Sequence, residues 1–121
     1  MEIILYGIPN CDTVKKARAW LTAHDIAYRF HDFKKDGVSR GLVAGWLDKL
    51  RWETLVNQRG TTWRGLPPEQ RDAVTDGDSA IALMLASPSV IKRPVLSTGK
   101  GYHVGFSPQQ YEQLFGTQAA T

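Results

Sequence analysis

The sequence predicts one α/β domain whose elements follow the order β-α-β, a helical insertion, and β-β-α. Three observations support this prediction. Short apolar runs end at Gly or Pro, apolar residues elsewhere recur at helical spacing, and a glycine-rich turn separates two short strand patterns near the C-terminus. The chain has 121 residues, of which 42% are hydrophobic and 22% charged. This composition suits a single domain with a packed core.

The first strand and helix are predicted from residues 3–23. The apolar run "IILY" ends in "GIP", which is typical of a central strand that is buried on both faces. Asn10 then stands where a helix N-cap is expected, and apolar residues recur at helical spacing over residues 11–23. The sequence therefore predicts a strand, a tight turn and an amphipathic helix.

A second strand and a helical insertion follow. Apolar and polar residues alternate over residues 26–33, and a strand-helix-strand order implies a right-handed parallel crossover. Between about residues 40 and 87 helical patterns dominate. They are interrupted at Gly60, at Gly65 and at the Pro67-Pro68 pair, which predicts short helical pieces between two longer helices.

The last third of the chain predicts a hairpin and a closing helix. The segments "PVLS" and "YHVGF" read as two strands, with Gly99 and Gly101 as the turn glycines. Ser107 is the expected N-cap of the closing helix, Pro108 its first residue, and Gln110 the partner that completes a capping box. The final segment "GTQAAT" is predicted to be a short tail.

Composition narrows the class of function. The net charge is +3, but Lys and Arg are scattered without a run of five like charges, which favours a small anionic substrate over nucleic acid. The opening "MEIILYG" has no secretory-signal pattern, and no segment approaches the roughly 18 apolar residues of a membrane span. Cys11, as the single cysteine, cannot form a disulfide within the chain, so the expected compartment is a reducing cytoplasm.

Cys11 is either a buried filler or a reactive thiol. Free cysteines are mostly buried and inert. Cys11, however, falls in the first turn of a predicted helix, where unpaired backbone N–H groups and the helix dipole favour the thiolate. Such surroundings lower the pKa of a thiol from about 8.5 to between about 3.5 and 7.5. Lys15 and Lys16 read as a solvated helix face, so the prediction of a nucleophile rests on the helix terminus.

Other chemistries find little support in the sequence. The three histidines have no metal-site spacing, and one cysteine is too few for a zinc cluster. The glycines of "GKGYHVG" belong to a hairpin turn and do not open a helix, so they predict no phosphate loop. The four tryptophans are expected to pack in the core and the insertion. The chain is therefore predicted to use thiol chemistry without a metal.

Three motifs carry a family resemblance. "YGIPNCDTVKKA" at the start, "RGTTWR" in the insertion and "IKRPVL" before the hairpin together resemble the arsenate reductase-like (ArsC/Spx) family, in particular its small glutathione-dependent thiol reductase-like branch. The motifs stand in the family's order over nearly the whole chain. The resemblance implies a single thioredoxin-like domain over residues 1–121, with a mixed four-stranded sheet, a helical insertion, and glutathione or a glutaredoxin as the reductant.

The resemblance also implies site residues. Cys11 matches the family's nucleophile, and Arg59 and Arg93 match arginines that bind an oxyanion. A guanidinium can grip a tetrahedral oxyanion or a carboxylate through two parallel hydrogen bonds. The alternative for Arg59 is a solvated loop charge, whereas Arg93 lies between apolar residues and a proline, where a solvated charge is less natural. Backbone N–H groups after Asn10 are expected to stabilise the thiolate.

Pro94 resembles the cis-proline that faces the cysteine in thioredoxin folds. If it is cis, the adjacent peptide is expected to lie open to the backbone of a bound peptide or of glutathione. The alternative for Pro94 is an ordinary proline at the start of a strand.

Two departures from the family pattern bear on the substrate. Arsenate reductases carry a third arginine at the end of the hairpin, where this chain has Gly105 and Phe106, so arsenate itself is not favoured. Phe106 is expected instead to pack on Tyr111 as a hydrophobic staple. Val14 stands where a resolving cysteine of a CxxC motif would be, which excludes a dithiol mechanism within the chain.

The first functional hypothesis is a cytoplasmic thiol reductase that depends on glutathione. Its Cys11 thiolate would attack a disulfide or an electrophilic oxyanion, and an external thiol would resolve the covalent adduct. The expected partners are glutathione or a glutaredoxin and a small anionic or disulfide substrate, with no direct nucleic-acid or membrane contact. Two alternatives stay open: a redox regulator that binds RNA polymerase, as the Spx branch does, and an arsenate reductase.

Overall fold

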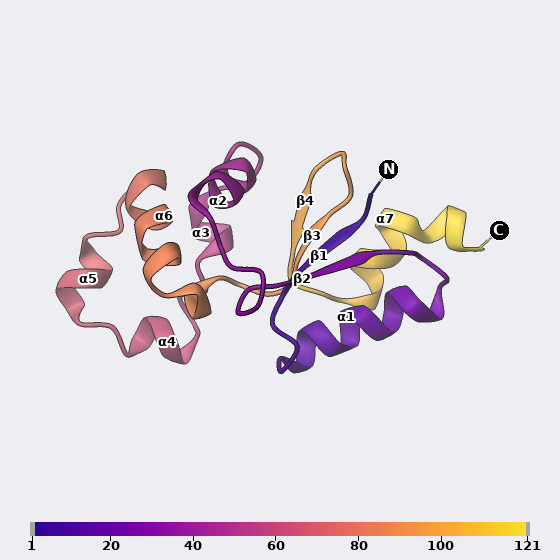
Figure 1. The fold of residues 1–121 in the computed structure, drawn as a ribbon, viewed down its shortest axis with the longest axis horizontal. Helices are drawn as coiled ribbons and strands as arrows, with labels where there is room; N and C mark the ends of the chain where they lie inside the picture. Colours follow the sequence, from indigo (N-terminus) through magenta and orange to yellow (C-terminus); the bar gives the residue numbers. More distant parts are fainter. Residues whose placement is uncertain (1, 121) are drawn as a thin grey trace. The chain divides into compact units, whose positions relative to one another are not determined.

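The computed structural model describes residues 2–120, and the side chains of residues 2–115. Its strands form a mixed four-stranded sheet in the order β2-β1-β3-β4 (Figure 1). The strands are β1 (Ile4–Gly7), β2 (Arg29–Asp32), β3 (Val95–Ser97) and β4 (Tyr102–Val104). β1 pairs in parallel with β2 and antiparallel with β3, and β3 pairs antiparallel with β4. The α/β fold with a mixed sheet is as predicted.

The chain divides into two compact units. The first, which we call the sheet unit, comprises the residues up to Asp36 and those from Arg93 onward. It contains the four strands with α1 (Asp12–Ala23) and α7 (Pro108–Ala120). The second, the insertion unit, spans Gly37–Lys92 and contains the helices predicted between residues 40 and 87.

One face of the sheet is covered by α1 and α7. Leu5 of β1 pairs in register with Leu96 of β3, so both side chains point to the same face. The helices add the other buried members of this core, which are Val14, Ala17, Leu21, Tyr111 and Phe115. The ring of Trp20 on α1 meets those of Tyr111 and Phe115 at centroid distances of 5.5 and 6.0 Å. The helix that follows Cys11 is therefore anchored along its length to the strand that precedes it.

The insertion unit has an apolar interior of its own. Its helices are α2 (Arg40–Leu47), α3 (Trp52–Leu55), α4 (Thr61–Arg64), α5 (Pro68–Asp72) and α6 (Gly77–Ala86), followed by the 3₁₀ turn η1 (Pro88–Val90). α2 packs on α6, and Trp46 and Met84 are fully buried. The predicted interruptions are confirmed, because α4 lies between Gly60 and Gly65 and α5 begins at Pro68.

The two longer helices of the insertion unit, α2 and α6, each begin with a side-chain cap. Ser39 Oγ accepts a hydrogen bond from the Leu42 N–H at 3.2 Å at the start of α2. At the start of α6, Asp76 accepts from the Ser79 N–H at 2.9 Å while Ser79 Oγ accepts from the Asp76 N–H at 3.1 Å.

Within the described residues, no helix is long and apolar enough to cross a bilayer.

Both predicted turn glycines lie in the hairpin turn: Gly99 has a φ of +83°, and the Gly101 carbonyl accepts a hydrogen bond from the Thr98 N–H at 3.1 Å. Three local predictions need correction. The N-cap of α1 is Cys11, not Asn10, because Cys11 keeps extended backbone angles while its carbonyl accepts the first helical bond. β2 is shorter than the predicted 26–33. The helix α7 continues to Ala120, through the described part of the predicted tail, whose last residue, Thr121, lies outside the described residues.

The start of α7 agrees with its prediction in part. The Gln110 N–H donates to Ser107 Oγ at 3.1 Å, which confirms the N-cap. The Gln110 side chain donates to the Val104 carbonyl at 3.5 Å and so bonds to the end of β4, not back to the cap as a capping box requires. Phe106 meets the Tyr111 ring edge-on at 4.6 Å between centroids, which confirms the hydrophobic staple.

Candidate active site

Cys11 lies in the turn between β1 and α1. β1 ends at Gly7 and α1 begins at Asp12, which leaves Cys11 as the last extended residue before the helix. The Cys11 carbonyl accepts a hydrogen bond from the Lys15 N–H at 2.9 Å, the first bond of the helix. Its side chain is half-buried and packs against the core of the sheet unit. The thiol is thus held beside the N–H groups of the first helical turn.

Opposing effects set the ionisation of Cys11. Burial by itself raises the pKa of the thiol, but the nearby Val14 N–H, Arg93 side chain and Thr13 N–H lower it, and the charge of Arg93 lowers it further. The net result is a pKa below the ordinary thiol value. At neutral pH a larger fraction of such a thiol is ionised than of an ordinary cysteine, and the thiolate is the nucleophilic form.

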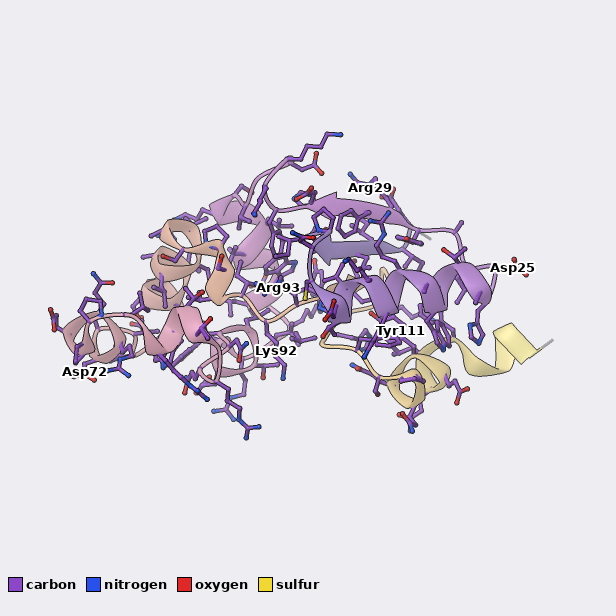
Figure 2. All side chains as sticks on the ribbon, turned by 90° about the horizontal axis from the view of Figure 1, so that it is seen from below. Asp25, Arg29, Asp72, Lys92, Arg93 and Tyr111 are labelled. Carbon is purple, nitrogen blue, oxygen red and sulfur yellow. The ribbon has the colours of Figure 1, made fainter. Side chains whose placement is uncertain are left out.

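Strand pairing brings Arg93 to this turn. β3 runs antiparallel to β1, with Val95 opposite Tyr6. Residues just before β3 therefore lie beyond the C-terminal end of β1, where the chain turns towards Cys11. Figure 2 labels Arg93 in this segment, and the Arg93 side chain lowers the pKa of the Cys11 thiol. The structure thus brings together two of the predicted site residues from opposite ends of the sequence.

Pro94 follows Arg93 through a cis peptide bond, and its side chain is buried. Its carbonyl accepts a hydrogen bond from the Gly105 N–H at 2.9 Å, which ties the start of β3 to the end of β4. That the peptide beside Pro94 lies open to a ligand stays a prediction. Gly105 has a φ of +81°, a conformation that favours glycine. This backbone conformation is a physical reason for a glycine at position 105.

Other predicted site residues lie on the surface. Asn10 is exposed and directly precedes Cys11. Arg59 is exposed in the insertion unit, in the loop between α3 and α4, and its backbone N–H donates to Asn57 Oδ1 at 3.2 Å. The substrate contact predicted for Arg59 stays a prediction. Lys15 and Lys16 are exposed, as expected of a solvated helix face.

Sequence reasoning did not identify which backbone groups meet the sulfur. It expected N–H groups after Asn10 in general, whereas the N–H groups that lower the pKa of the Cys11 thiol are those of Thr13 and Val14. It also gave Gly7 no part beyond ending the strand. The only signal for both was the position of glycine and cysteine on either side of a tight turn.

The fold and the Cys11 turn define a thioredoxin-like α/β protein with a single cysteine at the start of its first helix. The model of the ArsC family matches residues 6–114. The chain belongs to the ArsC family.

The proteins to which this chain is similar include an uncharacterized protein, a protein related to arsenate reductase and a transcriptional regulator. An uncharacterized protein of Haemophilus influenzae is 39% identical over 114 residues, covering 93% of this chain and 98% of the relative. The solution structure of an arsenate reductase (ArsC) related protein from Brucella melitensis is 50% identical with a TM-score of 0.76, covering 95% of both chains. The global transcriptional regulator Spx of Streptococcus mutans is 24% identical, covering 89% of this chain and 79% of its own.

Proposed function

We propose that this protein is a thiol reductase that depends on glutathione, with Cys11 as its nucleophile. The observation that carries the proposal is the place of Cys11 at the N-cap of α1, where the N–H groups of Val14 and Thr13 and the guanidinium of Arg93 lower the pKa of its thiol. Each of these stabilises the thiolate over the thiol. The similarity to an arsenate reductase related protein over 95% of the chain supports an oxidoreductase of this class.

The proposed reaction is a thiol-disulfide exchange. The Cys11 thiolate attacks one sulfur of a disulfide, which forms a mixed disulfide with Cys11 and releases the other sulfur as a thiolate. A glutathione thiolate then attacks the substrate-derived sulfur and regenerates Cys11. A second glutathione releases the remaining substrate thiol and leaves as glutathione disulfide. Two glutathiones are thus oxidised for each disulfide reduced, and no metal is needed.

The remaining site residues have proposed roles in binding. Arg93 offers a cation beside the sulfur, which suits a carboxylate of glutathione or the anionic end of a small substrate. Arg59 is proposed as a second anion-binding group. Asn10 and Pro94 stand next to Cys11 and Arg93 in the chain, and we propose that they contact the bound glutathione. Glutathione as the reductant and a free catalytic thiol both require a reducing compartment, so we propose that the protein acts in the cytoplasm.

Turnover of a small disulfide tests the proposal. Purified protein is mixed with bis(2-hydroxyethyl) disulfide and glutathione, and the glutathione disulfide formed is measured through the NADPH consumed by glutathione reductase. We expect turnover by the native protein, loss of turnover in Cys11→Ser, and no change in the control Lys16→Ala, whose side chain is exposed. An active Cys11→Ser protein would end the proposal.

Arsenate reduction is the alternative within the enzyme class. Replacing disulfide by arsenate in the same assay separates the two activities. The Gly105–Phe106 stretch lacks the third arginine, so we expect arsenate to give little or no turnover with glutathione. Arsenate turnover faster than disulfide turnover would make this chain an arsenate reductase.

A regulatory function is the second candidate, and the similarity to the Spx regulator favours it. In this form the protein would bind RNA polymerase and act without turnover. Immobilised protein is incubated with cell extract, and bound proteins are identified by mass spectrometry. Retention of polymerase subunits together with an absence of glutathione-linked turnover would favour this candidate over the reductase.

A further inference from the structure

The end of β1 and the first turn of α1 approach each other closely at Gly7. A Cβ atom at this position would lie 2.8 Å from Val14 Cγ2 and 3.5 Å from Val14 Cγ1. The first distance is below the 3.0 Å limit that real Cβ contacts respect. Gly7 is therefore the residue that allows α1 to approach the strand as closely as it does.

Neither side of this contact can yield easily. Val14 is fully buried, and a valine in a helix has one strongly preferred rotamer. Turning the Cβ hydrogen toward position 7 would take Val14 out of that rotamer inside a fully packed core, which is costly. The Gly7 carbonyl accepts from the Phe33 N–H at 2.9 Å, and Gly7 pairs with Asp32 of β2. The strand end is thus tied to the sheet, so any added atom must displace the first turn of α1.

That turn begins at Cys11, which is the N-cap of α1. Val14, whose side chain packs against position 7, belongs to the same turn, and its backbone N–H, with that of Thr13, lowers the pKa of the Cys11 thiol. We propose that Gly7 is a positioning residue for Cys11: its missing side chain lets the first turn of α1 dock on β1, which fixes where the N–H groups of that turn lie relative to the thiol. This inference concerns the site on which the proposed function rests.

Thiol reactivity as a function of pH tests the role of Gly7 without any assumption about substrate. The rate of Cys11 alkylation by iodoacetamide is measured across pH by intact mass, with folding checked by circular dichroism. In Gly7→Ala we expect the midpoint to move upward and the rate below neutral pH to fall about three- to tenfold, because a displaced turn weakens the N–H donors. Arg93, the charged side chain at the sulfur, is unchanged in this variant.

Two further variants make the test specific. Gly101→Ala adds the same methyl group in the sheet unit, where nothing lies within 4 Å, and should leave the alkylation profile unchanged. Gly7→Ala combined with Val14→Ala removes both methyl groups that the new Cβ would meet while keeping the Val14 N–H. We expect this double variant to regain the native midpoint.

The outcomes separate clearly. A folded Gly7→Ala protein with the native profile overturns the inference. If Gly7→Ala does not fold, the double variant decides: a native midpoint supports the inference, and a raised midpoint or a second failure to fold overturns it. A native protein that lacks disulfide turnover would count against the proposed function alone, since the alkylation profile is independent of turnover.

Discussion

At the scale of single residues, the chemistry depends on what surrounds one sulfur atom. Cys11 is half-buried, which by itself would raise its pKa, yet two backbone N–H groups and one guanidinium outweigh this effect. The backbone donors come from neighbours in the sequence, whereas Arg93 arrives through strand pairing. Local and long-range contributions to the thiolate can therefore be separated by substitution.

Arg93→Ala isolates the long-range contribution. The guanidinium lowers the pKa of the Cys11 thiol, so its loss should raise that pKa. We expect slower alkylation below neutral pH, about three- to tenfold. Arg93→Lys is the matched control, because it keeps a charge and should retain part of the effect. Equal alkylation profiles for all three proteins would show that Arg93 does not influence the thiol.

The lowered pKa of Cys11 also predicts a pH dependence of stability. The folded pKa lies below the unfolded value of about 8.5, so at a pH between the two values the folded protein binds fewer protons than the unfolded chain. The stabilisation that results is fully present above the unfolded pKa and is lost as the pH falls through the folded pKa. The unfolding free energy of the native protein relative to Cys11→Ser should thus increase with pH in that window. Urea titrations under reducing conditions at several pH values measure it, and a constant difference would contradict the prediction.

Tyr111 offers a stability prediction in the core. Its side chain is 0% exposed, and its hydroxyl has no hydrogen-bond partner among the described residues. Burial also raises the pKa of this phenol. Because an unpaired buried hydroxyl costs about 1–3 kcal/mol, Tyr111→Phe should raise the free energy of unfolding by about 1 kcal/mol. Tyr28→Phe is the control, since the Tyr28 hydroxyl accepts from Arg18 Nε at 3.0 Å and its loss should bring no gain.

At the scale of elements, glycines decide how helices begin and how closely they pack. Gly41 lies inside α2 with nothing within 4 Å of a new Cβ, whereas Gly37 precedes that helix with a φ of +84° and equally open space. The two positions differ in backbone conformation but not in room for a side chain. They form a matched pair for measuring conformational cost.

Substituting alanine for Gly41 and for Gly37 should change the free energy of unfolding in opposite directions. Gly41→Ala should stabilise the protein by about 0.5–1 kcal/mol, because alanine loses less conformational freedom in a helix. Gly37→Ala should destabilise it by about 1–2 kcal/mol, because a Cβ is disfavoured at positive φ. Chemical denaturation measures both changes. A shift of the same sign in both variants would show that open space, and not backbone conformation, governs these sites.

At the scale of the whole molecule, the chain buries two separate sets of apolar side chains. The sheet unit buries Leu5, Leu21 and Leu96, and the insertion unit buries Trp46 and Met84, each residue being fully covered. Each unit also has its own internal hydrogen bonds. We therefore expect loss of a core side chain to loosen its own unit first.

Native-state hydrogen exchange tests this expectation. Met84→Ala and Leu21→Ala each remove a fully buried side chain and should each cost about 2–5 kcal/mol. We expect Met84→Ala to speed amide exchange mainly in α2 and α6, and Leu21→Ala mainly in β1 and β3. Uniform acceleration throughout the chain in both variants would mean that the two units open as one.

The order of elements could be predicted from the sequence because it rests on short-range patterns. Apolar runs, helical spacing and turn residues act within a few positions, and they placed the strands, α1, the insertion and the hairpin. Element ends were less predictable. The N-cap prediction for Asn10 was wrong because the helix boundary depends on where backbone angles change, and the tail prediction was wrong because a glycine at position 116 does not by itself end α7.

The sequence by itself determined that one cysteine stands at the start of the first helix, since that position follows from the strand pattern before it and the helical pattern after it. Only the tertiary structure decided what meets that cysteine. Arg93 reaches the sulfur because β3 pairs antiparallel with β1, and Gly7 touches Val14 because α1 docks on the sheet. Contacts between residues distant in the chain depend on pairing and packing of whole elements, which no local pattern specifies.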